Sequence, residues 1–297
     1  MSSAPPARGG VPAGADLPPP GSRSSRILGS ARVEGRRAVL VAVASTVVFT
    51  SLLAVLVINS PGWLEVKRAF FSGEQFRESL PGIVRAFVVN VELFTLAEAF
   101  ILVLALLLAV LRSLPGPVFT PVRALAIGYT DFFRGVPTIL VIYILGFGAP
   151  ALDLQGVPKS PFVWGVVSLV LVYTAYVAEV YRAGIESVHP SQIAAARSLG
   201  LSRWQSTRFV VVPQAVRRVI PPLLNDFVGL QKDTALAAII GVFEAFRQAQ
   251  IDNAATFNFT PYLGTALLFV LVTIPLARFT DQLILRDRRR REAGGAL

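Results

Sequence analysis

Apolar residues along the chain gather into six long runs, each separated from the next by a shorter stretch of charges, prolines or glycines. A helix rises about 1.5 Å per residue, so about 20 apolar residues in succession cross the ~30 Å hydrocarbon core of a bilayer. The pattern therefore predicts an all-α polytopic membrane protein with six spans. The runs are Ala38–Ile58, Phe87–Leu111, Ala124–Phe147, Phe162–Tyr181, the segment from Arg218 to Val242, and Tyr262–Leu285.

Basic residues between these runs predict how the spans are oriented. Loops on the cytoplasmic side of a membrane protein carry an excess of lysine and arginine. If the N-terminus lies inside, Arg112, Arg123, the stretch Arg182–Arg218 and the final arginines all fall on the cytoplasmic side. The second and third outer loops then hold few basic residues. We expect a multi-pass protein of the cell membrane with both termini in the cytoplasm.

Composition narrows the possible chemistry. Hydrophobic residues make up 54% of the chain and charged residues only 15%, below the roughly 25% of soluble domains. The chain has no cysteine, and His189 is its only histidine, which argues against thiolate or histidine-rich metal sites and against a Ser-His-Asp triad elsewhere. The net charge of +10 comes from arginines beside apolar runs and fits membrane orientation better than nucleic-acid binding. We expect no metal, cofactor or nucleic-acid partner.

Four regions follow from this pattern. Residues 1–35 are rich in Pro, Gly, Ala, Ser and Arg and are predicted to be a disordered cytoplasmic tail. Residues 36–84 hold one transmembrane helix and an outer loop, residues 85–285 the remaining five spans, and residues 286–297 a basic cytoplasmic tail. The run Ala38–Ile58 has no ionisable residue, so we interpret it as a peripheral packing helix.

The stretch Pro190–Gln214 is the longest amphipathic, helix-favouring segment between spans. Ser191 is predicted to cap a short helix, and Gly200 to end it. A second short helix is expected over Leu201–Val211. A helix–glycine–helix unit between two spans is suited to dock into a groove of another protein.

This stretch carries a family resemblance. A-A-A-R-S-L-G-L-S-R-W-Q, followed by V-V-V-P-Q-A, resembles the cytoplasmic coupling loop (the EAA loop) of bacterial ABC-importer permeases, most closely the polar amino-acid uptake family. The resemblance implies a coupling loop over residues 183–214 that contacts an ATPase, although Ala194 stands where the family has glutamate. Trp204 is expected either in the ATPase groove or at the lipid interface. Glu179 also matches the family and is expected to orient the loop through an arginine. The implied coupling residues are Glu179, Ala194, Ala195, Ala196, Gly200, Leu201, Arg203 and Trp204.

Charged residues also occur deep inside the apolar runs. A charge at the bilayer centre costs from a few to more than ten kcal/mol unless it is paired or faces a water-filled cavity. Glu98, Arg134, Lys232 and Asp233 all lie about mid-depth, counted at ~1.5 Å per residue from the cytoplasmic arginines or the span ends. They are therefore candidates for a transport pathway.

Arg134 precedes a predicted helix break. Pro137 removes a helix hydrogen bond and Gly135 loosens the backbone. Freed backbone groups beside a guanidinium could form a carboxylate site. The segment resembles the R-G-T-P segment of polar amino-acid permeases, with Val136 in place of threonine. The alternative is a structural ion pair of Arg134 with Asp131 or with another helix.

The segment Lys232–Leu236 resembles the family's K-D-T-S-L. Adjacent residues do not face each other on a helix, so Lys232 and Asp233 need separate partners. Asp233 is expected to pair with another helix, Lys232 either to pair or to line the pathway, and Glu98 to pair with Arg134 or Lys232. The pathway candidates are Glu98, Arg134, Gly135, Pro137, Lys232, Asp233 and Thr234.

The resemblance implies a five-helix ABC-importer permease core over residues 85–285, with one extra N-terminal helix. It implies an ABC ATPase dimer, a second permease subunit and an extracytoplasmic substrate-binding protein as partners of this chain, with membrane lipid around its spans. No G-x-x-x-x-G-K-[ST] segment is present, so we expect a partner rather than this chain to hydrolyse ATP. The departure at Ala194 favours a heterodimer of permeases.

The cargo is expected to be a polar amino acid. The stretch Ala255–Tyr262 resembles the glutamate-type branch of the family, which makes glutamate, aspartate or glutamine candidates. Two alternatives stay open. Glu98 and Asp233 could be relay groups of an ion-coupled carrier, or the intramembrane charges could serve a polytopic membrane enzyme.

Overall fold

The computed structural model describes residues 24–294, and side chains over residues 38–285. It divides into two compact units, Met1–Leu64 and Glu65–Leu297, which we describe separately. Most of the predicted N-terminal tail and the side chains of the C-terminal tail lie outside the described residues. The α-helices are α1 (Ser24–Ile58), α2 (Trp63–Phe70), α3 (Gly73–Ser113), α4 (Thr120–Gly135), α5 (Thr138–Tyr143), α6 (Ala149–Ala151), α7 (Pro161–Glu186), α8 (Pro190–Ser198), α9 (Arg203–Ser206), α10 (Val212–Asp233), α11 (Ala245–Thr256) and α12 (Thr260–Gly294). The described part of the chain contains no strand.

The first unit consists mainly of α1. This helix begins at Ser24, so the last twelve residues of the predicted disordered tail, 24–35, are helical. Side chains over Ala38–Ile58 are exposed throughout. The hydroxyls of Thr46 and Thr50 donate to the carbonyls of Ala42 and Thr46 at 2.7 and 2.6 Å. Both hydroxyls are therefore satisfied within the helix, which suits a helix surrounded by lipid.

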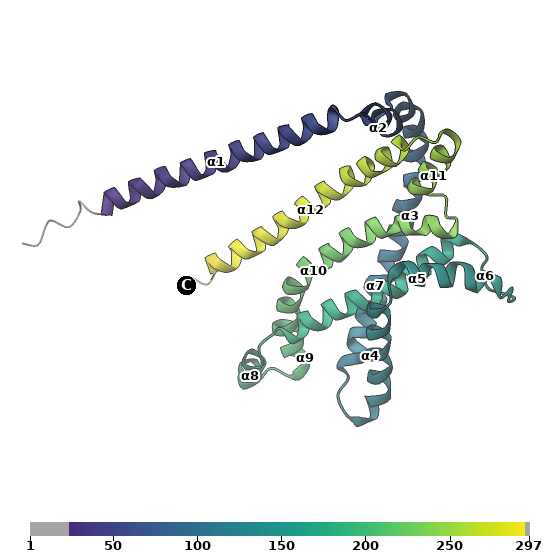
Figure 1. Ribbon diagram of the computed structural model, residues 1–297. Coiled ribbons are helices and arrows are strands. Elements are labelled where there is room, and N and C mark those ends of the chain that lie inside the picture. Colours follow the sequence, from purple (N-terminus) through teal and green to yellow (C-terminus); the bar gives the residue numbers. More distant parts are fainter. Residues whose placement is uncertain (1–23, 295–297) are drawn as a thin grey trace, which may run out of the picture. The chain divides into compact units, whose positions relative to one another are not determined.

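The core of the second unit lies between α3 and α7 (Figure 1). Residues of α3 recur at spacings of three and four along one buried stripe, which includes Ile83, Leu93, Ala97 and Ile101. This is the period of one face of a helix. Small residues on that stripe allow α7, which buries Leu169 and its neighbours, to approach closely. The helices α10 and α12 then pack on these two.

The third predicted span is broken where the sequence placed the break. The α4 and α5 arms are bent by 101°. Val136 between them is extended, with φ −93° and ψ 131°, as a residue before proline prefers. After α5 the chain continues as a π-helix over Ile144–Gly148, named η2. The predicted run Ala124–Phe147 is therefore two short arms rather than one straight helix.

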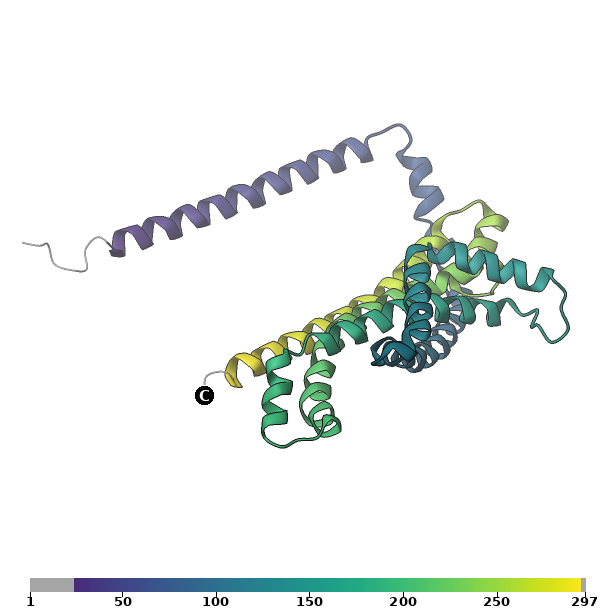
Figure 2. The ribbon, with the colours of Figure 1, turned by 90° about the horizontal axis from the view of Figure 1, so that it is seen from below.

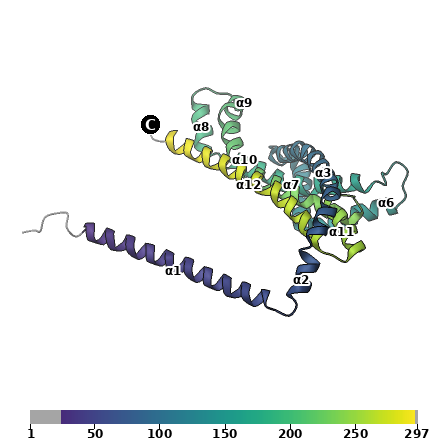
Figure 3. The same cartoon turned by 90° about the horizontal axis from the view of Figure 1, so that it is seen from above.

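The coupling stretch folds as a helical hairpin of α8 and α9 that projects from the α7 and α10 ends (Figures 2 and 3). Gly200 ends α8 as predicted, with φ +85°. The bonds Gly200 N to Arg197 O (3.0 Å) and Leu201 N to Ala196 O (3.2 Å) complete a Schellman motif. The predicted cap Ser191 is wrong, because Pro190 takes the first helical position and His189 Nδ1 accepts from the Ser191 N–H at 3.2 Å.

The far end of α10 also differs from the predicted single span. The helix gives way at Thr234 to a 3-10 helix over Thr234–Ile240, named η4, which ends at Gly241 with φ +89°. Next comes α11, where the sequence predicted only a loop. Buried Glu244 caps α11 through bonds from the N–H groups of Phe246 (2.9 Å) and Arg247 (2.7 Å), so the capping side chain accounts for this helix.

Four helical segments among the described residues are long and apolar enough to cross a membrane, or five if the bent pair of α4 and α5 counts as one span. The helix α10 is not among them, since it carries Arg217, Arg218, Asp226, Lys232 and Asp233. Six spans therefore require that the bent pair crosses the membrane as one span and that α10 crosses it as well.

Candidate functional site

A cavity of about 340 Å³ lies between the end of α4, the second half of α7 and α10. Three helices from distant parts of the sequence supply its walls. Of the predicted site residues it contains Arg134 and Glu179. Its polar lining residues are Arg134, Tyr176, Glu179, Ser187, Arg218 and Asp226.

Arg134 reaches this cavity from the last turn of α4. Its guanidinium carbon lies 6.0 Å from the centre of the Tyr176 ring, a cation–π contact. Side chains described in the structure form no ion pair with Arg134, so the alternative pairing with Asp131 is not present. The guanidinium is therefore available to an anionic ligand.

Asp226 was missed by sequence reasoning, although its position between Arg218 and Lys232 could have marked it as a third mid-span charge. It lines the same cavity from α10. Its Oδ2 atom is buried and has no hydrogen-bond partner among the described residues. A buried carboxylate oxygen without a partner is unfavourable unless a cationic or hydrogen-bonding group satisfies it.

Glu98 lies on α3, where it interacts electrostatically with Asp226. Neither of its predicted ion pairs, with Arg134 or with Lys232, occurs among the described side chains. An acidic residue of α3 and one of α10 are thus close enough to interact.

The pathway candidates Lys232, Asp233 and Thr234, where α10 ends and η4 begins, have different surroundings. Lys232 is exposed and forms no ion pair among the residues described. Asp233 Oδ2 accepts from the Tyr173 hydroxyl of α7 at 3.0 Å, a helix-to-helix contact. Thr234 is fully buried, and its Oγ1 accepts from Asn90 Nδ2 at 3.1 Å. None of the three lines the cavity that contains Arg134.

Asn90 connects this segment to α11. Its Nδ2 also donates to Glu244 Oε2 at 2.8 Å, and its Oδ1 accepts from Ala245 N at 3.1 Å. Glu244 is 0% exposed, and burial raises the pKa of its carboxyl group. These buried bonds tie α3, η4 and α11 together.

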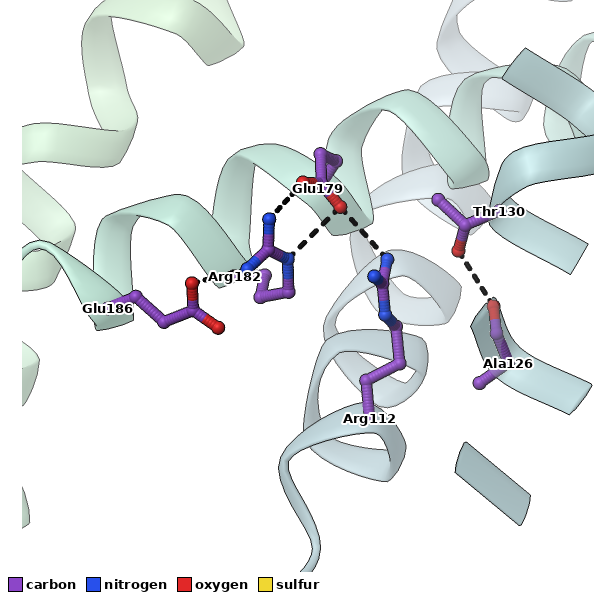
Figure 4. A network of polar contacts seen from close by, with 6 residues as sticks. All are labelled: Arg112, Ala126, Thr130, Glu179, Arg182 and Glu186. Atoms are coloured by element: carbon purple, nitrogen blue, oxygen red, sulfur yellow. Dashed lines mark hydrogen bonds and ion pairs between the residues drawn. The ribbon is translucent and has the colours of Figure 1, made fainter. Parts of the chain in front are cut away.

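Glu179 joins two helices at the base of the coupling hairpin (Figure 4). Its Oε2 accepts from Arg112 Nη1, at the end of α3, at 2.9 Å, and from Arg182 Nε at 3.1 Å. Arg182 also pairs with Glu186 one turn further along α7. The expected contact of Glu179 with an arginine is thus present twice, once within α7 and once across to α3.

A second link at the hairpin base joins α7 to α10. Arg218 Nη1 donates to the Ser187 carbonyl. Nearby, a Cβ added to Gly184 would overlap Val219 Cγ2. The two helices therefore touch directly where the hairpin leaves the core.

We expect Gly184→Ala to lower the free energy of unfolding by about 1–3 kcal/mol, because the added methyl group has no room. Thermal denaturation in detergent measures the change. Gly128→Ala is the matched control, since nothing lies within 4 Å of a Cβ at Gly128. Equal melting temperatures for Gly184→Ala and the unaltered chain would contradict the close contact of α7 with α10.

The hairpin presents most of the predicted coupling residues on its surface. Ala194, Ala195, Gly200, Arg203 and Trp204 are exposed, Leu201 is half-buried and Ala196 is buried inside the hairpin. Two further apolar side chains of this stretch, Leu199 and Phe209, are also exposed but were not among the predicted coupling residues. Exposed Trp, Leu and Phe side chains on one projecting hairpin form an apolar surface of the kind that marks protein interaction sites.

Residues 101–289 match the family of binding-protein-dependent transport system inner membrane components. The chain belongs to this family, and its cell-membrane location follows. Both were predicted from the coupling motif and the apolar runs, and both are confirmed.

Individual relatives agree with this assignment. The chain is 32% identical over 197 residues to the probable amino-acid permease protein YxeN of Bacillus subtilis. The matched residues make up 66% of this chain and 87% of that protein. The chain is 35% identical over 183 residues to the probable glutamine ABC transporter permease protein GlnM of the same organism, covering 61% and 81%. A crystal structure of an amino acid ABC transporter with histidines has 29% identity and a TM-score of 0.64, over 69% of this chain and 94% of that one. The MetNI methionine ABC transporter, at 16% identity and a TM-score of 0.57, shares the fold.

Proposed function

We propose that this chain is the transmembrane subunit of an ATP-driven importer and that it carries a polar amino acid through the cavity of about 340 Å³. The most direct support is that two side chains of opposite charge, Arg134 and Asp226, line the same cavity without forming an ion pair. Arg134 has no ion-pair partner among the described residues, and Asp226 Oδ2 has no hydrogen-bond partner there. An amino acid brings one carboxylate and one ammonium group, which would satisfy both.

The chemistry of each group fits its role. The planar guanidinium of Arg134 can bind a carboxylate through two parallel hydrogen bonds, beside the backbone freed by the break at Pro137. Asp226 would accept the ammonium group. The volume is at the lower end of the range for small-molecule sites, about 300–1,000 Å³, which favours a small cargo.

The remaining pathway candidates take different parts in this proposal. Glu98 extends the acidic side of the pathway, since it interacts with Asp226. Lys232 lines the pathway beyond the cavity, whereas Asp233 and Thr234 hold α10 against its neighbours. Glutamine-transporting relatives favour glutamine over glutamate or aspartate as cargo.

We further propose six spans with both termini in the cytoplasm, in which α10 crosses as part of the five-helix core over residues 85–285. Packing of α10 against α7 and α12 supports this. The regions 1–35, 36–84 and 286–297 would then be a tail, an added helix with its outer loop, and a basic tail.

Reporters test this topology. A reporter inserted near Pro190 and another fused after Leu297 are expected in the cytoplasm, and one inserted at Gly73 outside, because basic residues gather at the first two positions. Phosphatase activity reports a position outside the cytoplasm, and fluorescence of a fused fluorescent protein reports a position inside it. If Gly73 and Pro190 fell on the same side, the span count would be wrong.

The partners follow from the same proposal. An ABC ATPase dimer would dock on the α8–α9 hairpin, an extracytoplasmic binding protein would deliver the cargo, and a second permease would complete the pore. The exposed position of Ala194 on α8 supports a heterodimer, because a glutamate there would be free to contact a partner.

Ala194→Glu is therefore expected to strengthen retention of the ATPase on this chain, because position 194 is exposed in the middle of α8 and a carboxylate there would be free to form a charged contact with the partner. Co-purification in the absence of a second permease measures it, with Ala194→Gln as the uncharged control. Robust transport by the unaltered chain as sole permease would contradict the heterodimer.

One experiment tests the function as a whole. The chain is purified from its native membrane with its bound proteins, and ATP hydrolysis of the reconstituted complex is measured with each polar amino acid and its binding protein. We expect an ATPase to co-purify and one amino acid to stimulate it. Transport without any ATPase, driven by an ion gradient, would favour the ion-coupled carrier, and turnover of a substrate into a product would favour the enzyme.

A further inference from the structure

The short loop between α11 and α12 holds an aromatic residue in an unfavourable backbone conformation. Phe257 has φ +53°, in the left-handed region that residues with a bulky side chain rarely adopt. Its side chain is 86% exposed. An exposed, strained phenylalanine is unfavourable in water unless its surroundings hold it in place.

Hydrogen bonds fix the loop on both sides of this residue. The Phe257 N–H donates to the Asn253 carbonyl at 2.7 Å. Asn253 Nδ2 donates to the Asn258 carbonyl at 2.9 Å, and Asn258 Oδ1 accepts from the Thr260 N–H at 2.9 Å. The strained conformation is therefore determined by its surroundings, as at binding sites.

The same loop is bonded to the end of α2. Asn258 Nδ2 donates to the Arg68 carbonyl at 2.8 Å, and the Phe259 N–H donates to the Ala69 carbonyl at 2.7 Å. The last carbonyls of a helix have no partner within it, so the loop caps α2. The rings of Phe70 and Phe259 stack 4.9 Å apart. Phe70, Phe257 and Phe259, which we name the aromatic platform, thus share one rigid support.

The aromatic platform lies where two apolar helices begin. The Ser72 N–H, at the start of α3, donates to Thr260 Oγ1, at the start of α12, at 3.0 Å. From Phe259 an exposed apolar face continues along α12 at helical spacing through Leu263, Leu267 and Leu271. Only 17% of the apolar window of α12 is buried. The platform is thus the rim of an exposed apolar surface.

We propose that the aromatic platform inserts into the headgroup region of the lipid bilayer and anchors α2 along the membrane surface. Aromatic side chains concentrate at this depth. In α2, the exposed apolar residues Val66 and Phe70 lie one helical turn apart on the same face. Charged residues stand between them in the sequence, as in helices that lie in the interface plane. The bilayer rather than a protein is the partner, because the platform is continuous with the exposed apolar face of α12.

Tryptophan fluorescence tests this in the full-length chain. Trp63, Trp164 and Trp204 are replaced by phenylalanine, and Phe257→Trp supplies the single probe in phosphatidylcholine vesicles. Lipids brominated near the headgroup should quench the probe more than lipids brominated near the chain end. Val270→Trp, exposed in the middle of α12, is the control and should show the opposite order.

Two outcomes would overturn the proposal. Quenching of the Phe257→Trp probe by aqueous iodide and by neither lipid would place it in water. Protection from iodide and from both lipids would assign the surface to a protein partner.

A second pair of variants keeps the test independent of folding. Asparagine tolerates the left-handed region, so Phe257→Asn removes the ring without added backbone strain, whereas Phe257→Tyr keeps the ring. With Val66→Trp as the only probe, Phe257→Asn should reduce shallow-lipid quenching and Phe257→Tyr should not. Unchanged quenching in Phe257→Asn would show that Phe257 does not anchor α2.

Discussion

Arg134→Ala is expected to reduce uptake by on the order of 100-fold while the complex still assembles. The guanidinium forms no ion pair among the described side chains, so its removal leaves no charged partner behind. Hydrogen bonds to charged groups contribute about 1.5–3 kcal/mol, and 1.4 kcal/mol is about tenfold in an equilibrium constant. Uptake of labelled amino acid into vesicles measures the loss.

Two variants frame this result. Arg134→Lys should restore little, because an ammonium group cannot replace a planar fork that binds a carboxylate at two points. Arg123→Ala is the matched control on the same helix α4, since the partners of Arg123 among the described residues are the nearby Thr120 hydroxyl and the Leu114 and Gly116 carbonyls. Full uptake by Arg134→Ala would remove this residue from the pathway.

Asp226 allows the two ends of the cargo to be distinguished. If Arg134 binds the carboxylate and Asp226 the ammonium, Asp226→Asn should lose the preference of the transporter for cargo over an analogue that lacks the amino group. Arg134→Ala should lose its preference over an analogue that lacks the carboxylate. Competition by the two analogues separates these roles, and identical patterns for both variants would contradict the assignment.

Features that depend on local sequence could be predicted. The break before Pro137 follows from the missing N–H and the restriction on the preceding residue, and the end of α8 at Gly200 from its freedom to adopt φ +85°. Glu179 was expected to contact an arginine, and Arg182 lies within one turn of it. In each case the cause lies within a few residues of the effect.

Features that depend on which helix faces meet could not be predicted. Arg134 and Asp226 share a cavity, whereas Arg134 and Lys232, of similar predicted depth, do not. Depth follows from counting residues, but the direction of a side chain depends on how α4, α7 and α10 pack. Similarly, the cap of α11 is the buried Glu244, whose carboxylate also accepts a hydrogen bond from Asn90, a residue far away in sequence.

Glu179→Gln is expected to reduce the amount of substrate transported per ATP hydrolysed by roughly 10- to 100-fold. The carboxylate joins Arg112 of α3 to Arg182 of α7 (Figure 4), in the last two turns of the helix that leads into the coupling hairpin. Glutamine keeps the size of the side chain but loses the charge. We take about 1.5–3 kcal/mol for the lost charged hydrogen bonds, because the side chains of Arg112 and Glu179 are only 12% and 23% exposed and little screened.

Glu186→Gln provides the matched control. Glu186 lies on the same helix and pairs with the same Arg182, but its side chain is 61% exposed, and exposed pairs contribute about 0–1 kcal/mol. Uptake and ATP hydrolysis are measured together in vesicles, with substrate KM as a further readout. A positioning residue should lower the coupling ratio and leave KM unchanged. A rise in KM in Glu179→Gln with an unchanged coupling ratio would instead assign Glu179 to the substrate cavity that it also lines.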